Sequence, residues 1–350
     1  MSAPRLGADI AAVGLRYGDV QLDAGALRST LVNQRLIGLA AEATRHADGE
    51  PAWLEELDDS WQADALGMER LLVTVSTVLT EAGIDSRVIK GPALAHTVYP
   101  EASWRTFGDL DILVRGGQLD DARRLIVETF EARDPLPEVR PGFDAEFAKD
   151  VMLRIDRTEI DLHRTVAAGP FGMRIPTDEL FDSPTEFTLA GTTLRTLSPT
   201  ATFVQVCYNA ALGDVPPRLM SLRDVAQVQH HYQLAVDDIV KLADRWGGTA
   251  VVASAVTQAW ETLELEPTEL SDWATAYEPS WLDAKLLAAS VSEQRSYTRA
   301  LASVAAIKGP AAKVRYLRSV LSPSAEYLEA RNWTRGSHVR RAIDRLKPRR

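Results

Sequence analysis

The stretch WRTFGDLDILV, Trp104 to Val114, places two aspartates in a segment that otherwise has the pattern of a buried strand. Asp109 and Asp111 alternate with leucine, isoleucine and valine. Strand interiors disfavour aspartate, and a carboxylate taken out of water costs several kcal/mol unless its charge is compensated. A cost of this kind indicates that the two carboxylates serve a function.

Asp109 and Asp111 are expected on one face of a strand over residues 109–114, because successive strand side chains point to opposite faces. Two carboxylates this close repel, so one of them would hold a proton unless a cation neutralises the pair. Oxygen-rich clusters of this kind suit Mg²⁺ or Mn²⁺. Alone, the Asp-x-Asp pattern is a weak signal, and its context has to support it.

A second segment, TEIDLH at 158–163, offers a third carboxylate. Glu159, Asp161 and His163 share one face of this expected strand, and Glu159 competes with Asp161 for the position of third ligand. Three carboxylates from two adjacent strands would hold one or two divalent ions, which can clamp the attacking and leaving oxygens of a phosphoryl or nucleotidyl transfer. For His163 we expect a base, a nucleotide contact, support of a metal ligand or a structural hydrogen bond.

The upstream segment VIKGPALAHTVYP, residues 88–100, has the order strand, glycine turn, helix start. Such a turn presents backbone amides and the positive end of a helix dipole to an anion, and Lys90 adds a full charge. A triphosphate held there would lie beside ions bound by the aspartates. In the plain structural alternative, Gly91 only caps the helix and Lys90 is solvated.

The remaining pattern predicts an α+β protein. A long helix is expected over 61–82, strands over 86–90 and 109–114, and hairpins within 149–166 and 186–197. From Ser198 onward only helical periodicity is visible. We therefore expect a helical region over 1–60, a core with a small mixed sheet over 61–197, and a C-terminal helical region over 198–350.

Composition is that of an ordinary globular protein, with 45% apolar and 25% charged residues. We read no signal peptide and no membrane span, and the single cysteine cannot form an internal disulfide, so a cytoplasmic protein is expected. The net charge of −10 disfavours broad nucleic-acid binding. Eight basic residues against one acid lie within 331–350, a tail that would meet RNA, an acidic partner or only solvent.

These motifs together resemble the nucleotidyltransferase fold of the polymerase β-like superfamily. More narrowly, VIKGPALAHTVYPEASWRTFGDLDILV, followed by IDLHRTV and SLRDVAQV, is similar to the bacterial family described as uncharacterised nucleotidyltransferases. The resemblance extends from about Trp61 to Val228. The combination of motifs is specific, whereas any single piece is not.

The resemblance implies roles for particular carboxylates. Asp109 and Asp111 match the paired metal-binding aspartates of the family, and Asp161 matches its third carboxylate. These three residues are thus the expected catalytic and metal-holding groups, with Mg²⁺ or Mn²⁺ as cofactor.

The phosphate-binding residues match less closely. Lys90 and Gly91 stand where the wider superfamily has a Gly-Ser that grips the triphosphate, so the serine hydroxyl is absent and a lysine must replace it. Arg105 matches an arginine of the family that contacts phosphate or orients a carboxylate. Together with His163, these residues are expected to bind the nucleotide. For the adjacent Arg223 and Asp224, ordinary ion pairing is expected.

The implied activity is metal-dependent transfer of a nucleoside monophosphate from an NTP, ATP among them, to an acceptor hydroxyl with release of pyrophosphate. The lack of a broad basic face interleaved with aromatic residues favours a small molecule or a protein over RNA as acceptor. The alternative is a nucleotide-binding or partner-binding protein that keeps the fold without turnover.

Overall fold

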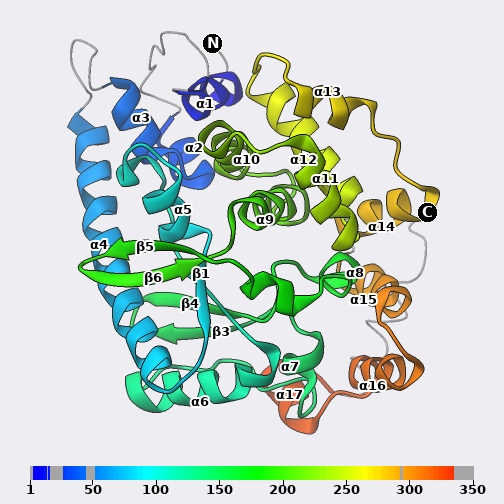
Figure 1. Cartoon of the computed structure of the whole chain (residues 1–350). Helices are drawn as coiled ribbons and strands as arrows, with labels where there is room; N and C mark the ends of the chain where they lie inside the picture. Colours follow the sequence, from blue (N-terminus) through cyan, green and yellow to red (C-terminus); the bar gives the residue numbers. More distant parts are fainter. Residues whose placement is uncertain (1–2, 14, 16–26, 45–51, 292–294, 335–350) are drawn as a thin grey trace.

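The computed structural model describes residues 3–13, 15, 27–44, 52–291 and 295–334 (Figure 1). At its centre is a mixed four-stranded sheet in the order β1-β2-β4-β3. Its strands are β1 (Ser86–Ile89), β2 (Leu110–Val114), β3 (Asp150–Ile155) and β4 (Thr158–His163). The β2/β4 pair is parallel, whereas β1/β2 and β3/β4 are antiparallel. A separate hairpin consists of β5 (Thr185–Leu189) and β6 (Thr192–Thr196). The β3/β4 and β5/β6 pairs are the two hairpins expected from the sequence, and both are confirmed.

Helices precede, interrupt and follow these strands, so the α+β class is confirmed. The N-terminal helices are α1 (Ala3–Ala11), α2 (Leu27–Gln34), α3 (Ile37–Thr44) and α4 (Ala52–Glu81). Between the strands lie α5 (Gly91–Thr97), α6 (Leu119–Phe130), α7 (Phe143–Phe147), α8 (Gly169–Gly172) and the short 3-10 turns η1 (Ala102–Trp104), η2 (Gly116–Gln118) and η3 (Thr177–Phe181). The C-terminal helices are α9 (Pro199–Leu212), α10 (Leu219–Tyr232), α11 (Val236–Arg245), α12 (Thr249–Thr262), α13 (Glu269–Ala276), α14 (Trp281–Val291), α15 (Arg295–Ala306), α16 (Pro310–Leu321) and α17 (Ala325–Ala330).

The long helix α4 starts at Ala52, nine residues before the expected start near Trp61. Leu54 is fully buried and Leu57 packs partly buried against the same helical core, so the apolar stripe continues toward the N-terminus. Glu55 lies in the first turn, where a negative charge complements the helix dipole. The acidic residues Glu55, Glu56, Asp58, Asp59 and Asp64 therefore all lie within α4.

The two faces of the central sheet have different surroundings. Leu110, Ile112, Ile160 and Leu162 are fully buried in one apolar cluster with residues of α4 and α6. Figure 1 shows α4 running along one side of the strands and α6 crossing beneath them. The opposite face carries the carboxylates and is turned toward the C-terminal helices.

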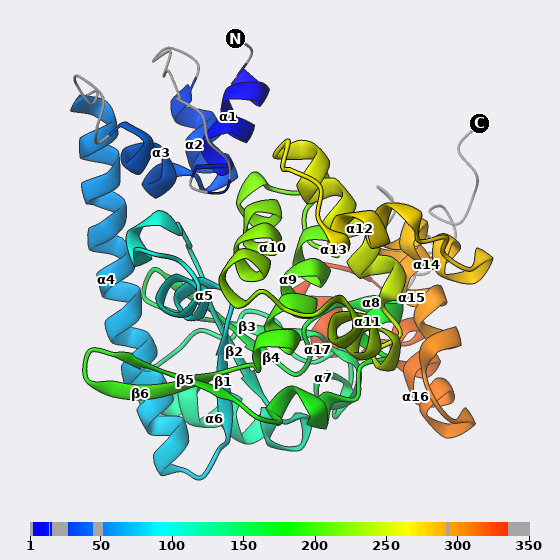
Figure 2. The ribbon, with the colours of Figure 1, turned by 45° about the horizontal axis from the view of Figure 1, so that its top comes forward.

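N-terminal and C-terminal helices share a second hydrophobic core, which joins α1–α3 to α9, α10 and α12. Arg223 on α10 is fully buried, and its guanidinium donates to the carbonyl oxygens of Ala11 (3.0 Å) and Val13. Figure 2 shows α1–α3 gathered beside the upper part of α4, on the side that faces α10. This docking brings residues from before position 45 close to the sheet.

Within the described ranges, no helix is both long and apolar enough to cross a membrane. The basic tail that the sequence suggested as an RNA contact lies almost entirely outside them, over 335–350.

Candidate active site

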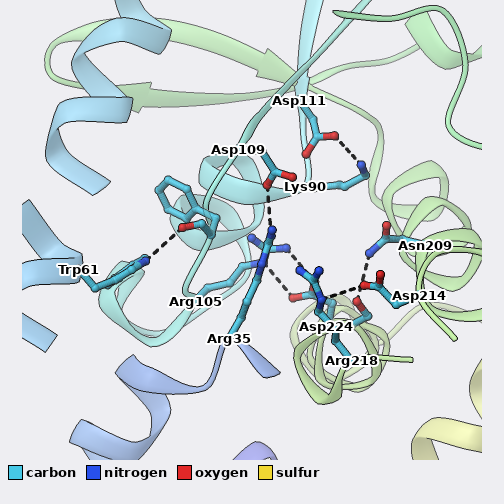
Figure 3. A network of polar contacts seen from close by, with 12 residues as sticks. Arg35, Trp61, Lys90, Arg105, Asp109, Asp111, Asn209, Asp214, Arg218 and Asp224 are labelled. Atoms are coloured by element: carbon cyan, nitrogen blue, oxygen red, sulfur yellow. Dashed lines mark hydrogen bonds and ion pairs between the residues drawn. The ribbon is translucent and has the colours of Figure 1, made fainter. Parts of the chain in front are cut away.

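A cavity of about 220 Å³ lies on the polar face of the sheet, between the start of α5, the turn joining α9 to α10, and the corner joining α2 to α3. It is lined by residues from four parts of the chain: Arg35, Lys90, Gly91, Arg105, Asp109, Asp111, Lys149, Asp161, Asn209, Gly213, Asp214, Arg218, Met220, Ser221 and Asp224. Every site residue expected from the sequence except His163 lines this cavity. Figure 3 shows several of these side chains converging from the strands and from α10.

A larger cavity, of about 380 Å³, lies between α4, β1 and β6. Among the described residues that line it, Asp85 is the single acidic one, and Arg195 is the single basic one. Of these two cavities, the smaller is the one whose side chains suit both a polyanionic ligand and a cation.

The floor of the smaller cavity is formed by two carboxylates in register. Asp111 of β2 lies directly opposite Asp161 of the parallel strand β4. Ligand atoms of Asp111, Asp161 and His163 all lie within 4.8 Å of one another. Carboxylate oxygens at this spacing, with an imidazole behind them, are a donor set that fits Mg²⁺ or Mn²⁺.

Asp111 is held by two donors. Its Oδ1 accepts from Lys90 Nζ at 2.5 Å and from His163 Nε2 at 2.6 Å. Burial alone would raise the pKa of Asp111, but the charge of Lys90 and the hydrogen bond from His163 together hold it well below its usual range. Asp111 is therefore ionised in the metal-free protein, although it is 2% exposed.

Asp161 behaves in the opposite way. Burial, followed by the negative charges of Asp150 and Asp111, raises its pKa to about 7. The sequence predicted that one of Asp109 and Asp111 would hold a proton unless a cation neutralised the pair. In the structure Lys90 pairs with Asp111 and Arg35 pairs with Asp109, and the carboxyl with the raised pKa is that of Asp161 on the adjacent strand.

Asp109 lies outside the strand in which it was expected. The pairing of β1 with β2 ends at Ile89 opposite Asp111, because Lys90 leaves the sheet, so Asp109 has no strand neighbour there. Its Oδ1 accepts from Arg35 Nη1 at 3.1 Å. Asp109 lines the cavity but is not part of the group formed by Asp111, Asp161 and His163.

The turn before α5 differs from the expected glycine turn. Lys90, not Gly91, has the unusual backbone, with φ 52° and ψ −133°. Non-glycine residues rarely adopt this conformation, and strained residues of this kind cluster at functional sites. A Cβ on Gly91 would meet the carbonyl oxygen of Asp109 at 3.5 Å, an ordinary contact, so space alone does not require glycine there.

Arg105 orients a carboxylate, one of the two roles expected for it. Its Nε and Nη2 donate to the two oxygens of Asp224 at 3.0 and 2.8 Å, and Tyr99 donates its hydroxyl to the same carboxylate at 2.8 Å. Asp224 thus pairs with Arg105 and not with its neighbour Arg223. The Nη1 atom of Arg105 is buried and has no hydrogen-bond partner in the described part of the chain.

His163 lies behind the cavity and is fully buried. Burial, and then the charges of Lys149 and Lys90, lower its pKa, so the ring is neutral near pH 7 and carries on Nε2 the proton that it donates to Asp111. Of the roles left open by the sequence, the geometry therefore supports a hydrogen bond that orients Asp111.

Several lining residues were missed by sequence reasoning. Lys149 pairs with Asp150 at 2.6 Å, and Asp150 lies opposite His163 in the β3/β4 register. The alternation of β3 could have placed Asp150 on the polar face. For Arg35 and for the α9–α10 turn, by contrast, the sequence carries no such signal.

A family model described as "Uncharacterised nucleotidyltransferase" matches residues 21–264. Among solved structures, the chain is similar to an antigenic nucleotidyltransferase-like protein from Paracoccidioides brasiliensis, with 12% identity and a TM-score of 0.35 over 57% of this chain and 92% of that one. A similarity this weak does not bear on the site. No curated protein matches the chain.

Proposed function

Because the chain belongs to the uncharacterised nucleotidyltransferase family, we propose that it transfers a nucleoside monophosphate from an NTP to an acceptor hydroxyl and releases pyrophosphate. The observation that carries this proposal is the register of Asp111 with Asp161 at the floor of a cavity whose walls bear basic side chains. Phosphoryl-type transfers depend on positioning and on charge neutralisation, and both are provided by such an arrangement.

Asp111 and Asp161, with Asp109 beside them, would hold Mg²⁺ or Mn²⁺. The ion would supply charge neutralisation at the reacting phosphate. His163 orients Asp111 through the Nε2–H bond, and Lys90 neutralises that carboxylate from the other side. The chain therefore fixes the position of Asp111 before any ligand arrives.

The acceptor hydroxyl gives its proton to a carboxylate oxygen of Asp161, which lies at the floor of the cavity. The acceptor oxygen forms a bond to the α-phosphorus of the NTP, and the bond from that phosphorus to the bridging oxygen breaks. Pyrophosphate leaves toward the basic side chains that line the cavity, beside the turn at Lys90 and Gly91.

The acceptor is proposed to be a small molecule or a protein hydroxyl, not RNA. Among the described residues that line the cavity, five are acidic and five are basic. A balanced lining of this kind suits one metal-bound triphosphate but lacks the excess of cations that a nucleic-acid backbone requires.

One experiment tests the activity. The protein is incubated with Mg²⁺, an NTP labelled at the α-phosphate, and a lysate, and the labelled species and released pyrophosphate are measured. We expect label on a small molecule or protein, lost in Asp111→Asn. Label transfer that persists at full rate in Asp111→Asn would contradict the proposed site.

The second candidate is a nucleotide-binding protein without turnover. The ion pair between Lys90 and Asp111 favours it, because an ammonium group already occupies one carboxylate oxygen that a metal would use. In that case Mg-NTP would bind and raise the melting temperature, yet no lysate fraction would release pyrophosphate.

A further inference from the structure

The charges of the cavity are arranged as matched pairs. Each basic residue that lines it, among those the structure describes, contacts an aspartate of its own: Arg35–Asp109 (3.1 Å), Lys90–Asp111 (2.5 Å), Arg105–Asp224 (2.8 Å), Lys149–Asp150 (2.6 Å) and Arg218–Asp214 (2.8 Å). An anionic ligand therefore competes with these carboxylates for the cations of the cavity. Which cations can change partner decides where the anion binds.

Three of these pairs are firmly held. Arg105 meets Asp224 with two hydrogen bonds, and both side chains are buried. Lys90 lies on Asp111, which is buried as well. Lys149 and Asp150 are each 27% exposed, but the charges of Asp111 and Asp161 also act on Lys149, so three carboxylates raise its pKa against the effect of burial. Removing any of these cations would leave buried negative charge uncompensated, which is costly.

The other two pairs are weaker. Arg35 makes one contact to Asp109, with side chains 27% and 32% exposed. Arg218 and Asp214 are 36% and 51% exposed. Ion pairs that solvent reaches and that rest on a single contact are weak, so these two arginines can change partner at less cost than the other three cations.

The segments that carry Arg35 and Arg218 are joined by a hydrogen bond. The side chain of Gln34, next to Arg35, accepts a hydrogen bond from the backbone N–H of Leu219, next to Arg218, at 2.8 Å. Gly38 fixes the other side of the α2–α3 corner, because a Cβ there would lie 1.7 Å from the carbonyl oxygen of Ser103. The two arginines are therefore carried by two segments that hold each other in place.

We propose that Arg35 and Arg218 form a clamp for the terminal phosphates of the nucleotide, each leaving its aspartate when the polyphosphate binds. This proposal rests on the proposed function, since it names the phosphate-binding residues of the same site. Guanidinium groups suit this task because they bind phosphate oxygens with two parallel hydrogen bonds. When Arg35 leaves Asp109, that carboxylate becomes free for a cation, so polyphosphate and Mg²⁺ strengthen each other's binding.

The test uses inorganic tripolyphosphate and Mg-ATP as probes in calorimetry with the full chain, each with and without Mg²⁺. Arg35→Gln and Arg218→Gln are each expected to weaken tripolyphosphate binding about tenfold, as the loss of one charge-assisted contact does. Arg35→Lys should recover part of the loss. Arg124→Gln is the matched control, because Arg124 is an exposed arginine paired with Asp121 on α6, away from the cavity. Melting temperatures of all variants establish that they are folded.

The outcomes separate the two proposals. Tight Mg-ATP binding that is unchanged in both arginine variants would overturn the clamp and leave the transferase proposal standing. Arginine-dependent tripolyphosphate binding without any nucleotide binding would overturn the transferase proposal and the nucleotide as ligand of the clamp, and would leave Arg35 and Arg218 as a site for polyphosphate alone. Equal affinity with and without Mg²⁺ would overturn the coupling through Asp109.

Discussion

The two faces of the central sheet are built from the same strands and differ in almost every physical property. On one face Leu110, Ile112 and Leu153 are fully buried against other apolar side chains. On the other, one residue along, Asp111 and Asp161 lie in a cavity with opposite shifts of pKa. The apolar face stabilises the fold. The polar face lowers stability, because it buries charged groups, and it carries the residues of the candidate site.

The largest expected effect is on the polar face. Asp111→Asn should lower transfer by about a thousandfold, equivalent to about 4 kcal/mol, because it removes the charge at the centre of the site. It also takes the charged partner from Lys90 and His163, so the melting temperature should fall. Rates are therefore compared per folded molecule. Undiminished transfer would show that the polar face is not the site.

A substitution on the apolar face should lower stability and leave nucleotide binding unchanged. Leu153→Ala in β3 leaves a cavity in the cluster shared with α4 and α6 and should lower the free energy of unfolding by about 3 kcal/mol. Nucleotide affinity, measured at a temperature where the variant is folded, should not change. A large loss of affinity in the folded variant would show that the two faces are not independent.

Stability should depend on pH through Asp161. Its folded pKa of about 7 lies above the ordinary value of 3.8, so in the metal-free protein a penalty develops as pH rises from about 4 through 7. Asp161→Asn removes that penalty and should stabilise the protein by about 1–2 kcal/mol at pH 8, after allowance for partial exposure, but by little at pH 4. Urea unfolding at the two pH values measures the difference. Equal stabilisation at both would argue against a raised pKa.

The smallest effect is expected for a carboxylate on the polar face but outside the cavity. Glu159 shares the face of Asp161, yet it pairs with Arg154 at 2.9 Å in an exposed ion pair. Glu159→Gln should change stability by less than about 0.5 kcal/mol and leave transfer unaltered. A marked loss of activity would mean that the site extends along β4 beyond the cavity.

Strand alternation was enough to predict much of this arrangement. The periods of TEIDLH and of LDILV place Asp111, Asp161 and His163 on one face, and the hairpins follow from short turn signals. The local sequence also predicted a turn before α5, although the residue with the unusual backbone conformation is Lys90 and not Gly91.

Contacts between distant segments could not be predicted in the same way. Arg35 reaches Asp109 across 74 positions, because α1–α3 dock on α10 and on the loop before β2. Helical periodicity tells which face of a helix is buried, but not which partner it meets. For the same reason the sequence could not predict that the α9–α10 turn lines the cavity. Asp214 and Arg218 reach the cavity only because of how α9 and α10 pack.

Because β2 and β4 pair in one parallel register, a chain that folds correctly also forms the carboxylate pair of the site. Asp111 opposes Asp161 only in the observed alignment. A slip of β4 by one residue would turn its side chains over, sending Ile160 and Leu162 into the cavity and Asp161 into the apolar cluster. Chains with misaligned strands would thus lose stability and the carboxylate pair together, and refolded material should be either fully competent for ligands or prone to proteolysis and aggregation.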